Sequence, residues 1–290
     1  MARPGIMLAV WLVFLGTAWG QAQDGESDAG WELSVAPAEV LYRTYVADPR
    51  RPVFGLTMID VSESDIDDAG DRRYGVRMGA RFGILQLHPP DEPGGGVQLA
   101  GEIGFLGQFD RDNSTDNIGW DGLYGFHLAW QARPELVLRL GLAHDSSHLG
   151  DEYIENTGRQ RIEYTREEFL FGMRYALHKS LCSYVEYGHG YDLRNEDLME
   201  EGRVELGLEF EPEPMWWNRR LAPFAALDVS AYEEDDWDEN LSVQLGVVLP
   251  GAGRGGSWRV GLEYYDGRSV IGELFQDREQ HLAFGLWLEV

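Results

Sequence analysis

The chain has 290 residues, of which 43% are hydrophobic, with a formal net charge of −26 and a single cysteine, Cys182. So negative a charge argues against a nucleic-acid partner, because phosphate binding needs clustered lysine and arginine. One cysteine excludes an intramolecular disulfide, and nothing in the sequence has the spacing of a zinc site. The length suits one large β-barrel or one to two soluble domains.

Residues 1–20 have the composition of a secretory signal peptide. Arg3 precedes an unbroken apolar run over residues 6–15, and small residues follow it. This order predicts a signal peptide that is cleaved on export. The run is shorter than the roughly 20 residues of a membrane-spanning helix, and no later stretch approaches that length. We expect residues 21–52 to form a periplasmic N-terminal segment, although residues 31–52 can instead insert into the fold as a plug.

From residue 53 onward the sequence alternates with a period of two. In residues 74–84 every second residue is apolar, and arginine or glycine fills the positions between. Such alternation predicts strands with one apolar face. About twelve strands are expected, near residues 53–61, 73–87, 97–109, 119–132, 136–146, 163–176, 182–193, 202–211, 222–233, 240–249, 257–265 and 280–290.

Three features favour a membrane-spanning barrel over a soluble periplasmic β-protein, which is the alternative. Many predicted strands reach the ~9–11 residues that cross a membrane when tilted. Turns rich in proline, glycine or basic residues alternate with longer or acidic loops, and aromatic residues cluster near strand ends. We therefore predict an all-β protein: a single antiparallel β-barrel over residues 53–290, in the outer membrane of a Gram-negative bacterium.

The predicted location also implies partners. The last strand places Leu282, Phe284, Leu286 and Leu288 on one face, as in strands that barrel-assembly machinery recognises. We expect the protein to contact this machinery, outer-membrane lipid and lipopolysaccharide, and no nucleic acid.

A polar motif ends the strand predicted over residues 136–146. Its alternation places His144 and Ser146 on the lipid-facing side, where histidine can deprotonate serine. Ser147, His148 and Asp151 continue the motif. Glu152 is the predicted orienting carboxylate, and Glu167 and Asn156 are the alternatives. The competing interpretation is a hydrogen-bonded base of an extracellular loop.

This His-x-Ser spacing resembles that of outer membrane phospholipase A and of the lipid A deacylase. The resemblance implies that Ser146 is a nucleophile and His144 a general base. In those enzymes asparagine follows the serine, whereas Ser147 follows it here.

A longer resemblance rests on Ala-Asp-Pro-Arg at residues 47–50 and on the run from His144 to Glu152. It connects the chain to a bacterial family catalogued as a domain of unknown function, number twelve hundred and seven. Membership implies an exported outer-membrane protein and brings no known activity.

Two further groups of charged residues allow alternatives. Asp235, Asp236 and Asp238 lie in an acidic run that can bind Ca²⁺ or can be a solvated loop; no other cofactor is expected. Charged residues on the predicted inner face can line a narrow channel or close the lumen with ion pairs. The primary prediction is therefore a structural or surface-binding barrel, with a lipid acyl hydrolase and a narrow channel as alternatives.

Overall fold

The computed structural model describes residues 30–195, 197–218, 220–249 and 256–290. The predicted signal peptide over residues 1–20 lies outside the described residues. Residues 31–290 form one compact unit. In the described part of the chain, no helix is long and apolar enough to cross a membrane.

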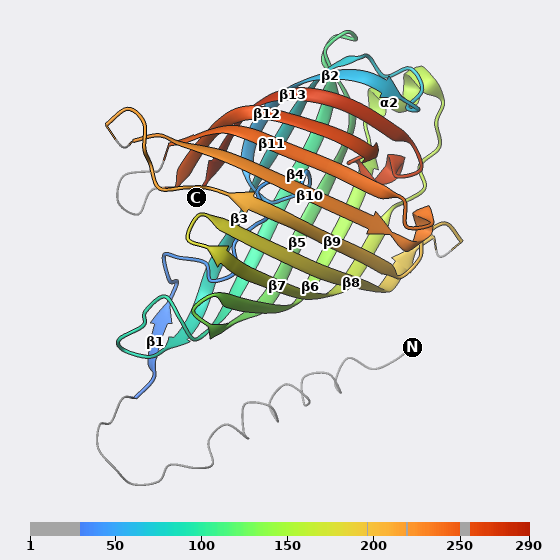
Figure 1. Ribbon diagram of the computed structural model, residues 1–290. Helices are drawn as coiled ribbons and strands as arrows, with labels where there is room; N and C mark the ends of the chain where they lie inside the picture. Colours follow the sequence, from blue (N-terminus) through green and yellow to red (C-terminus); the bar gives the residue numbers. More distant parts are fainter. Residues whose placement is uncertain (1–29, 196, 219, 250–255) are drawn as a thin grey trace. The chain divides into compact units, whose positions relative to one another are not determined.

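Twelve antiparallel strands close into a barrel, and one further strand lies at its edge (Figure 1). Each barrel strand pairs with its neighbours in sequence, and β13 closes the ring by pairing with β2. This confirms the predicted all-β barrel. The strands are β1 (Glu32–Val35), β2 (Phe54–Ser64), β3 (Arg72–His88), β4 (Val97–Asp110), β5 (Asp116–Arg133), β6 (Leu136–Leu149), β7 (Thr165–His178), β8 (Leu181–Arg194), β9 (Gly202–Phe210), β10 (Ala222–Tyr232), β11 (Glu239–Leu249), β12 (Ser257–Arg268) and β13 (Arg278–Glu289).

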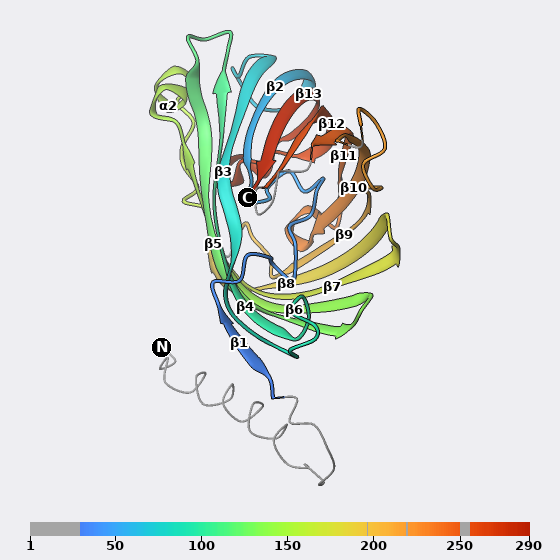
Figure 2. The same ribbon diagram turned by 90° about the vertical axis from the view of Figure 1, so that its left-hand side faces the viewer.

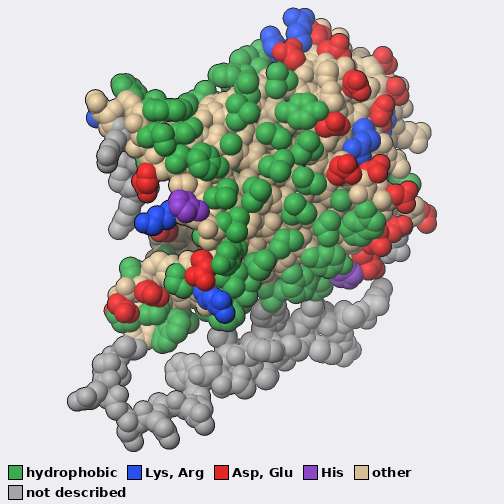
Figure 3. Space-filling model, in the orientation of Figure 1, with side chains coloured by type: hydrophobic (Ala, Val, Ile, Leu, Met, Phe, Trp, Pro, Cys, Tyr) green, Lys and Arg blue, Asp and Glu red, His purple; other side chains and the backbone are tan. Residues whose placement is uncertain are grey.

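The two faces of the wall differ as the alternation predicts. On β3, Met78 and Phe82 are exposed on the outside, whereas Arg77 and Arg81 are buried on the inside. Hydrophobic side chains cover the wall seen in Figure 3, and acidic side chains gather at the end where Figure 1 labels the helix α2 (Asp151–Thr157). An apolar outer wall with a charged interior is the pattern of a barrel with lipid outside.

The segment before β2 runs inside the ring of strands (Figure 2). Tyr42, Tyr45 and Ala47 are buried, and the Tyr45 ring stacks on that of Tyr184 with centroids 3.8 Å apart. The Tyr45 hydroxyl donates to Glu186 Oε2 on β8 at 2.9 Å. Residues 41–53 therefore lie inside the barrel, whereas Glu32–Val35 form the exposed edge strand β1.

The connection between β12 and β13 folds inward from the opposite end. It contains the short helix η2 (Gly272–Leu274), and Ile271 and Leu274 are fully buried. They pack in one cluster with Ile118 of β5 and Leu149 of β6. Residues 41–53 and this inward-folded loop, residues 269–277, thus occupy the lumen from its two ends.

Candidate functional site

The polar motif lies on β6, which extends to Leu149, three residues past its predicted end. The extension follows from pairing with β5, where His148 lies opposite Trp120 and Ser147 opposite Asp121. Residues that the sequence assigned to a loop therefore belong to the wall and alternate between its faces.

His144 lies on the outer wall beside a carboxylate. Its ring stacks on the exposed ring of Tyr124, with centroids 4.3 Å apart. Its Nδ1 is 2.5 Å from Glu167 Oε1, on the residue directly opposite in β7. The side chains of both residues are largely shielded from solvent, with exposed fractions of 17% and 27%. Since Nδ1 is bound to the carboxylate, Nε2 is the ring nitrogen left to accept a proton.

Ser146 is the next outward residue of β6. It lies opposite Gly122 of β5 and Thr165 of β7. A side chain at Gly122 would approach the serine, because a Cβ built there lies 3.6 Å from Ser146 Oγ. Glycine therefore leaves the space over the hydroxyl open. The sequence analysis did not identify Gly122 as part of the site. A glycine between Trp120 and Tyr124, on an otherwise aromatic face, could have indicated it.

The other residues of the predicted motif make different contacts. His148 faces outward like His144 and Ser146. Its ring is tilted against that of Trp120, with centroids 4.3 Å apart, and its Nδ1 is 2.6 Å from Arg161 Nη2. Asp151 and Glu152 are exposed on the first turn of α2. The carboxylate that binds His144 is thus Glu167, one of the alternatives, in place of the favoured Glu152. Asn156 is also exposed on α2.

Ser147 is buried on the inner face and fixes the inward-folded loop. Its hydroxyl donates to Asp121 and accepts a bond from the Glu273 backbone N–H at 2.8 Å. Asp121 also accepts the Gly272 N–H at 3.0 Å, and Glu273 accepts the Ile162 N–H at 2.7 Å. These bonds hold the loop against β5 and β6.

The substitution Ser147→Ala is expected to lower the free energy of unfolding by about 1–3 kcal/mol, because it leaves buried polar groups without a partner. Urea unfolding followed by tryptophan fluorescence in lipid vesicles measures the effect. Ser183→Ala is the control, since that hydroxyl makes only a 3.4 Å contact with the Tyr175 carbonyl. Equal midpoints for the two variants would contradict the assigned role.

The same loop is also tied to the segment after α2. Arg159 pairs with Asp277 Oδ2 at 2.6 Å. Burial raises the pKa of Asp277, and the neighbouring guanidinium opposes that shift. The Arg159–Asp277 ion pair thus helps to hold the inward-folded loop in place.

The charges predicted for the inner face lie there and form ion pairs with one another. Arg77 binds Glu263 at 3.0 Å, and Arg203 binds Glu186 at 2.9 Å and Glu205 at 2.7 Å. The space left between these side chains and residues 41–53 includes a cavity of about 140 Å³. The described lumen is therefore filled largely by ion pairs and by the chain itself.

The acidic run proposed for Ca²⁺ lies at the short helix η1 (Glu233–Asp235) and just beyond it. Asp235 pairs with Arg278 at 3.3 Å, and Asp236 ends the helix with a left-handed backbone. Among the residues that the structure describes, no three or more His, Cys, Asp or Glu side chains are grouped to hold a metal ion. Nothing in this run favours Ca²⁺ over a solvated loop.

The closed ring, the apolar outer wall and the charged lumen define the chain as a β-barrel of the outer-membrane class. Residues 30–289 match the family described as "Protein of unknown function (DUF1207)", and the chain belongs to this family. A search of curated protein sequences gave no significant match.

Solved structures of outer membrane phospholipase A resemble this fold. An active-site mutant of the Escherichia coli enzyme superposes with a TM-score of 0.61 at 11% identity, covering 83% of this chain and 93% of that one. The calcium-bound dimer from Salmonella typhi has a TM-score of 0.58 at 11% identity, covering 83% and 91%. At such low identity, the likeness establishes the barrel fold and no activity.

Proposed function

We propose that the protein is a lipid acyl hydrolase of the outer membrane, exported by its signal peptide, with Ser146 as nucleophile, His144 as general base and Glu167 as the orienting carboxylate. The observation that carries the proposal is the 2.5 Å contact between His144 Nδ1 and Glu167 Oε1, beside Ser146 on the outer wall. The substrates are lipids of the surrounding leaflet, phospholipid or lipopolysaccharide.

The chemistry follows from the roles of the three side chains. His144 Nε2 takes the Ser146 proton as Oγ attacks the ester carbonyl, and the carboxylate stabilises the imidazolium that forms. The same proton passes to the departing alcohol, which leaves an acyl group on Ser146. Water then attacks this ester, again with His144 as base, and releases the fatty acid.

The position of the three residues also needs an explanation. A histidine bound to a carboxylate is energetically unfavourable on a wall that otherwise presents apolar side chains to lipid. Polar groups in such positions usually mark functional sites. Trp120, on the same face, suggests the level of the membrane interface, where tryptophan is enriched. A reactive serine at this depth would meet the ester groups of membrane lipids.

One observation concerns the proposed site and another the alternative functions. No described hydrogen bond joins His144 to Ser146, but bonds of this kind are often long or poorly aligned without substrate and tighten on binding. The lumen holds residues 41–53 and the inward-folded loop, which supports a narrow channel less than an activity on the outer wall. A structural or surface-binding barrel is the outcome if hydrolysis fails.

The test is fatty-acid release from phospholipid and from lipopolysaccharide by the detergent-folded protein, with and without Ca²⁺. A fluorophosphonate probe, which forms a bond to activated serines, is used in parallel. Ser146→Ala is compared with Ser183→Ala, another outward serine, and folding is monitored by migration of unheated samples on gels.

We expect release and labelling by the wild type and by Ser183→Ala, and neither by folded Ser146→Ala. Release that survives in Ser146→Ala would refute the proposed nucleophile. Absence of both signals from the wild type, under conditions in which a known hydrolase works, would refute the proposed function.

A further inference from the structure

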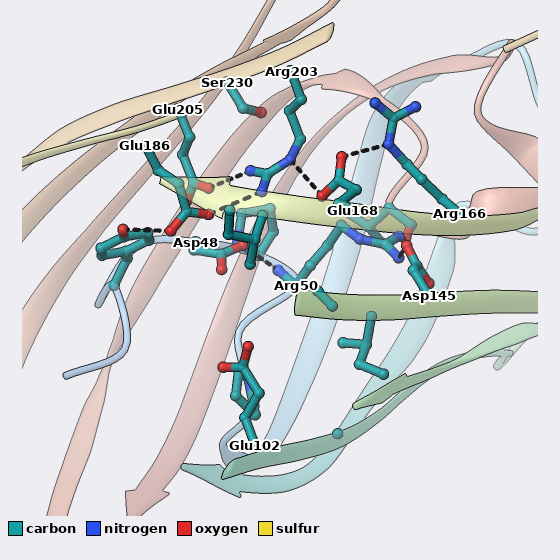
Figure 4. Close-up of a pocket in the computed structure, with 18 of the residues that line it drawn as sticks. Asp48, Arg50, Glu102, Asp145, Arg166, Glu168, Glu186, Arg203, Glu205 and Ser230 are labelled. Carbon is teal, nitrogen blue, oxygen red and sulfur yellow. Dashed lines mark hydrogen bonds and ion pairs between the residues drawn. The ribbon is translucent and has the colours of Figure 1, made fainter. Parts of the chain in front are cut away.

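Arg50 connects the segment in the lumen to the strand that carries the proposed site. Its guanidinium binds Asp145 on β6 (Figure 4). It also lies 2.7 Å from Asp121 Oδ2 on β5 and binds the Val270 carbonyl of the inward-folded loop. The backbone N–H of Arg50 donates to Asp48 Oδ1 at 2.7 Å, which fixes the turn that presents the side chain. One guanidinium thus joins two strands and a loop from inside the barrel.

Asp145 lies between His144 and Ser146 in the chain and points to the opposite side of the wall. Its Oδ2 binds Arg50, and its Oδ1 is buried without a hydrogen-bond partner among the described residues. In the described part of the chain, Arg50 is the one cation paired with this carboxylate. The inner side of the strand segment that carries His144 and Ser146 is therefore held by Arg50.

Asp121 shares the same guanidinium from the neighbouring strand. It lies opposite Ser147, and its oxygens accept bonds from that hydroxyl and from the Gly272 N–H. Without Arg50, two carboxylates on adjacent strands would face each other inside the barrel. Their repulsion in a poorly hydrated interior would displace this part of β5 and β6 from its present position.

We propose that Arg50 is a positioning residue for the outer-wall site, acting through Asp145 so that the filled lumen sets the geometry of His144 and Ser146. The proposal rests on the proposed function. The family resemblance rests on residues 47–50 and on the run from His144. These two parts of the sequence meet at the ion pair between Arg50 and Asp145, which gives them a common role.

The test compares Arg50→Gln with Arg51→Gln. Arg51 is the next residue of the segment, is more deeply buried than Arg50, and pairs with Glu289 at 2.9 Å away from β6. Both variants remove one buried positive charge, but only Arg50→Gln leaves Asp121 and Asp145 without their cation. A double variant, Arg50→Gln with Asp145→Asn, removes the repulsion between the two carboxylates.

For Arg50→Gln we expect kcat for acyl release to fall about 10- to 100-fold with little change in KM, since small displacements of reacting groups have effects of this size. Arg51→Gln should keep kcat near that of the wild type, and the double variant should recover part of the loss. Equal losses in the two single variants, or no recovery, would overturn the proposal.

Hydrogen–deuterium exchange of peptides covering residues 142–149 provides a readout that needs no activity. Faster exchange there in Arg50→Gln, and unchanged exchange in Arg51→Gln, is expected. If the wild type releases no fatty acid, the proposed function fails, and exchange alone decides whether Arg50 holds β6. Unchanged exchange in Arg50→Gln would overturn the proposal whatever the activity.

Discussion

Glu167→Gln is expected to lower kcat for acyl release by about 10²- to 10⁴-fold while the barrel stays folded. Glutamine can still accept a bond from His144 Nδ1, but it has no charge to stabilise the imidazolium that forms as Ser146 attacks. The neutral amide can also present its NH₂ group to the ring and so favour the wrong tautomer. The measurement is the initial rate of fatty-acid release at saturating substrate.

Glu152→Gln is the matched control. Glu152 follows the motif closely in sequence, yet it is exposed on α2, whereas Glu167 lies directly opposite His144. We expect this control to keep the wild-type rate. A large loss in Glu152→Gln together with full activity in Glu167→Gln would reverse the assignment.

Arg203→Gln is expected to have the largest effect on stability. The Arg203 guanidinium binds three glutamates, at 3.3 Å on β7, 2.9 Å on β8 and 2.7 Å on β9. Two of the three have a second arginine nearby, but Glu205 is paired with Arg203 alone among the described ion pairs. Breaking a buried pair by removing one partner costs about 3–5 kcal/mol, because the other charge stays buried.

Denaturant unfolding in vesicles, followed by tryptophan fluorescence, measures this loss. Arg194→Gln is the control, since that arginine is exposed and lies 3.5 Å from an exposed Glu163. An exposed ion pair of this kind contributes about 0–1 kcal/mol to the free energy of unfolding. Adding Glu205→Gln to Arg203→Gln should restore part of the stability. Equal stability of the two arginine variants would contradict the role given to the lumen network.

The strands could be predicted because each carries its own signal. A strand with lipid on one side and packed charges on the other must alternate, so Met78 and Arg77 of β3 reveal their faces without knowledge of any neighbour. Strand ends were less certain because pairing with a neighbouring strand decides where a strand stops. The end of β6, for example, is set by its pairing with β5. The outward direction of His144 and Ser146 followed from the same alternation.

The partners of these residues depend on tertiary structure. The connection between β6 and β7 contains α2, and its length does not reveal which residue of β7 lies opposite His144, so Glu167 could not be preferred over Glu152. Arg50 meets Asp145 only because the preceding segment enters the lumen. The apolar residues Val270, Ile271, Leu274 and Phe275 were the available signal that the predicted outer loop folds inward.

The outward direction of His144 and Ser146 determines how a substrate would arrive. A site on the side of a barrel is reached by lateral diffusion within the leaflet, so the encounter rate would follow the mole fraction of substrate lipid and not its amount per volume of water. The fatty acid and the remaining lysolipid would be released into that same leaflet. Each turnover would then change the composition of the membrane that holds the protein.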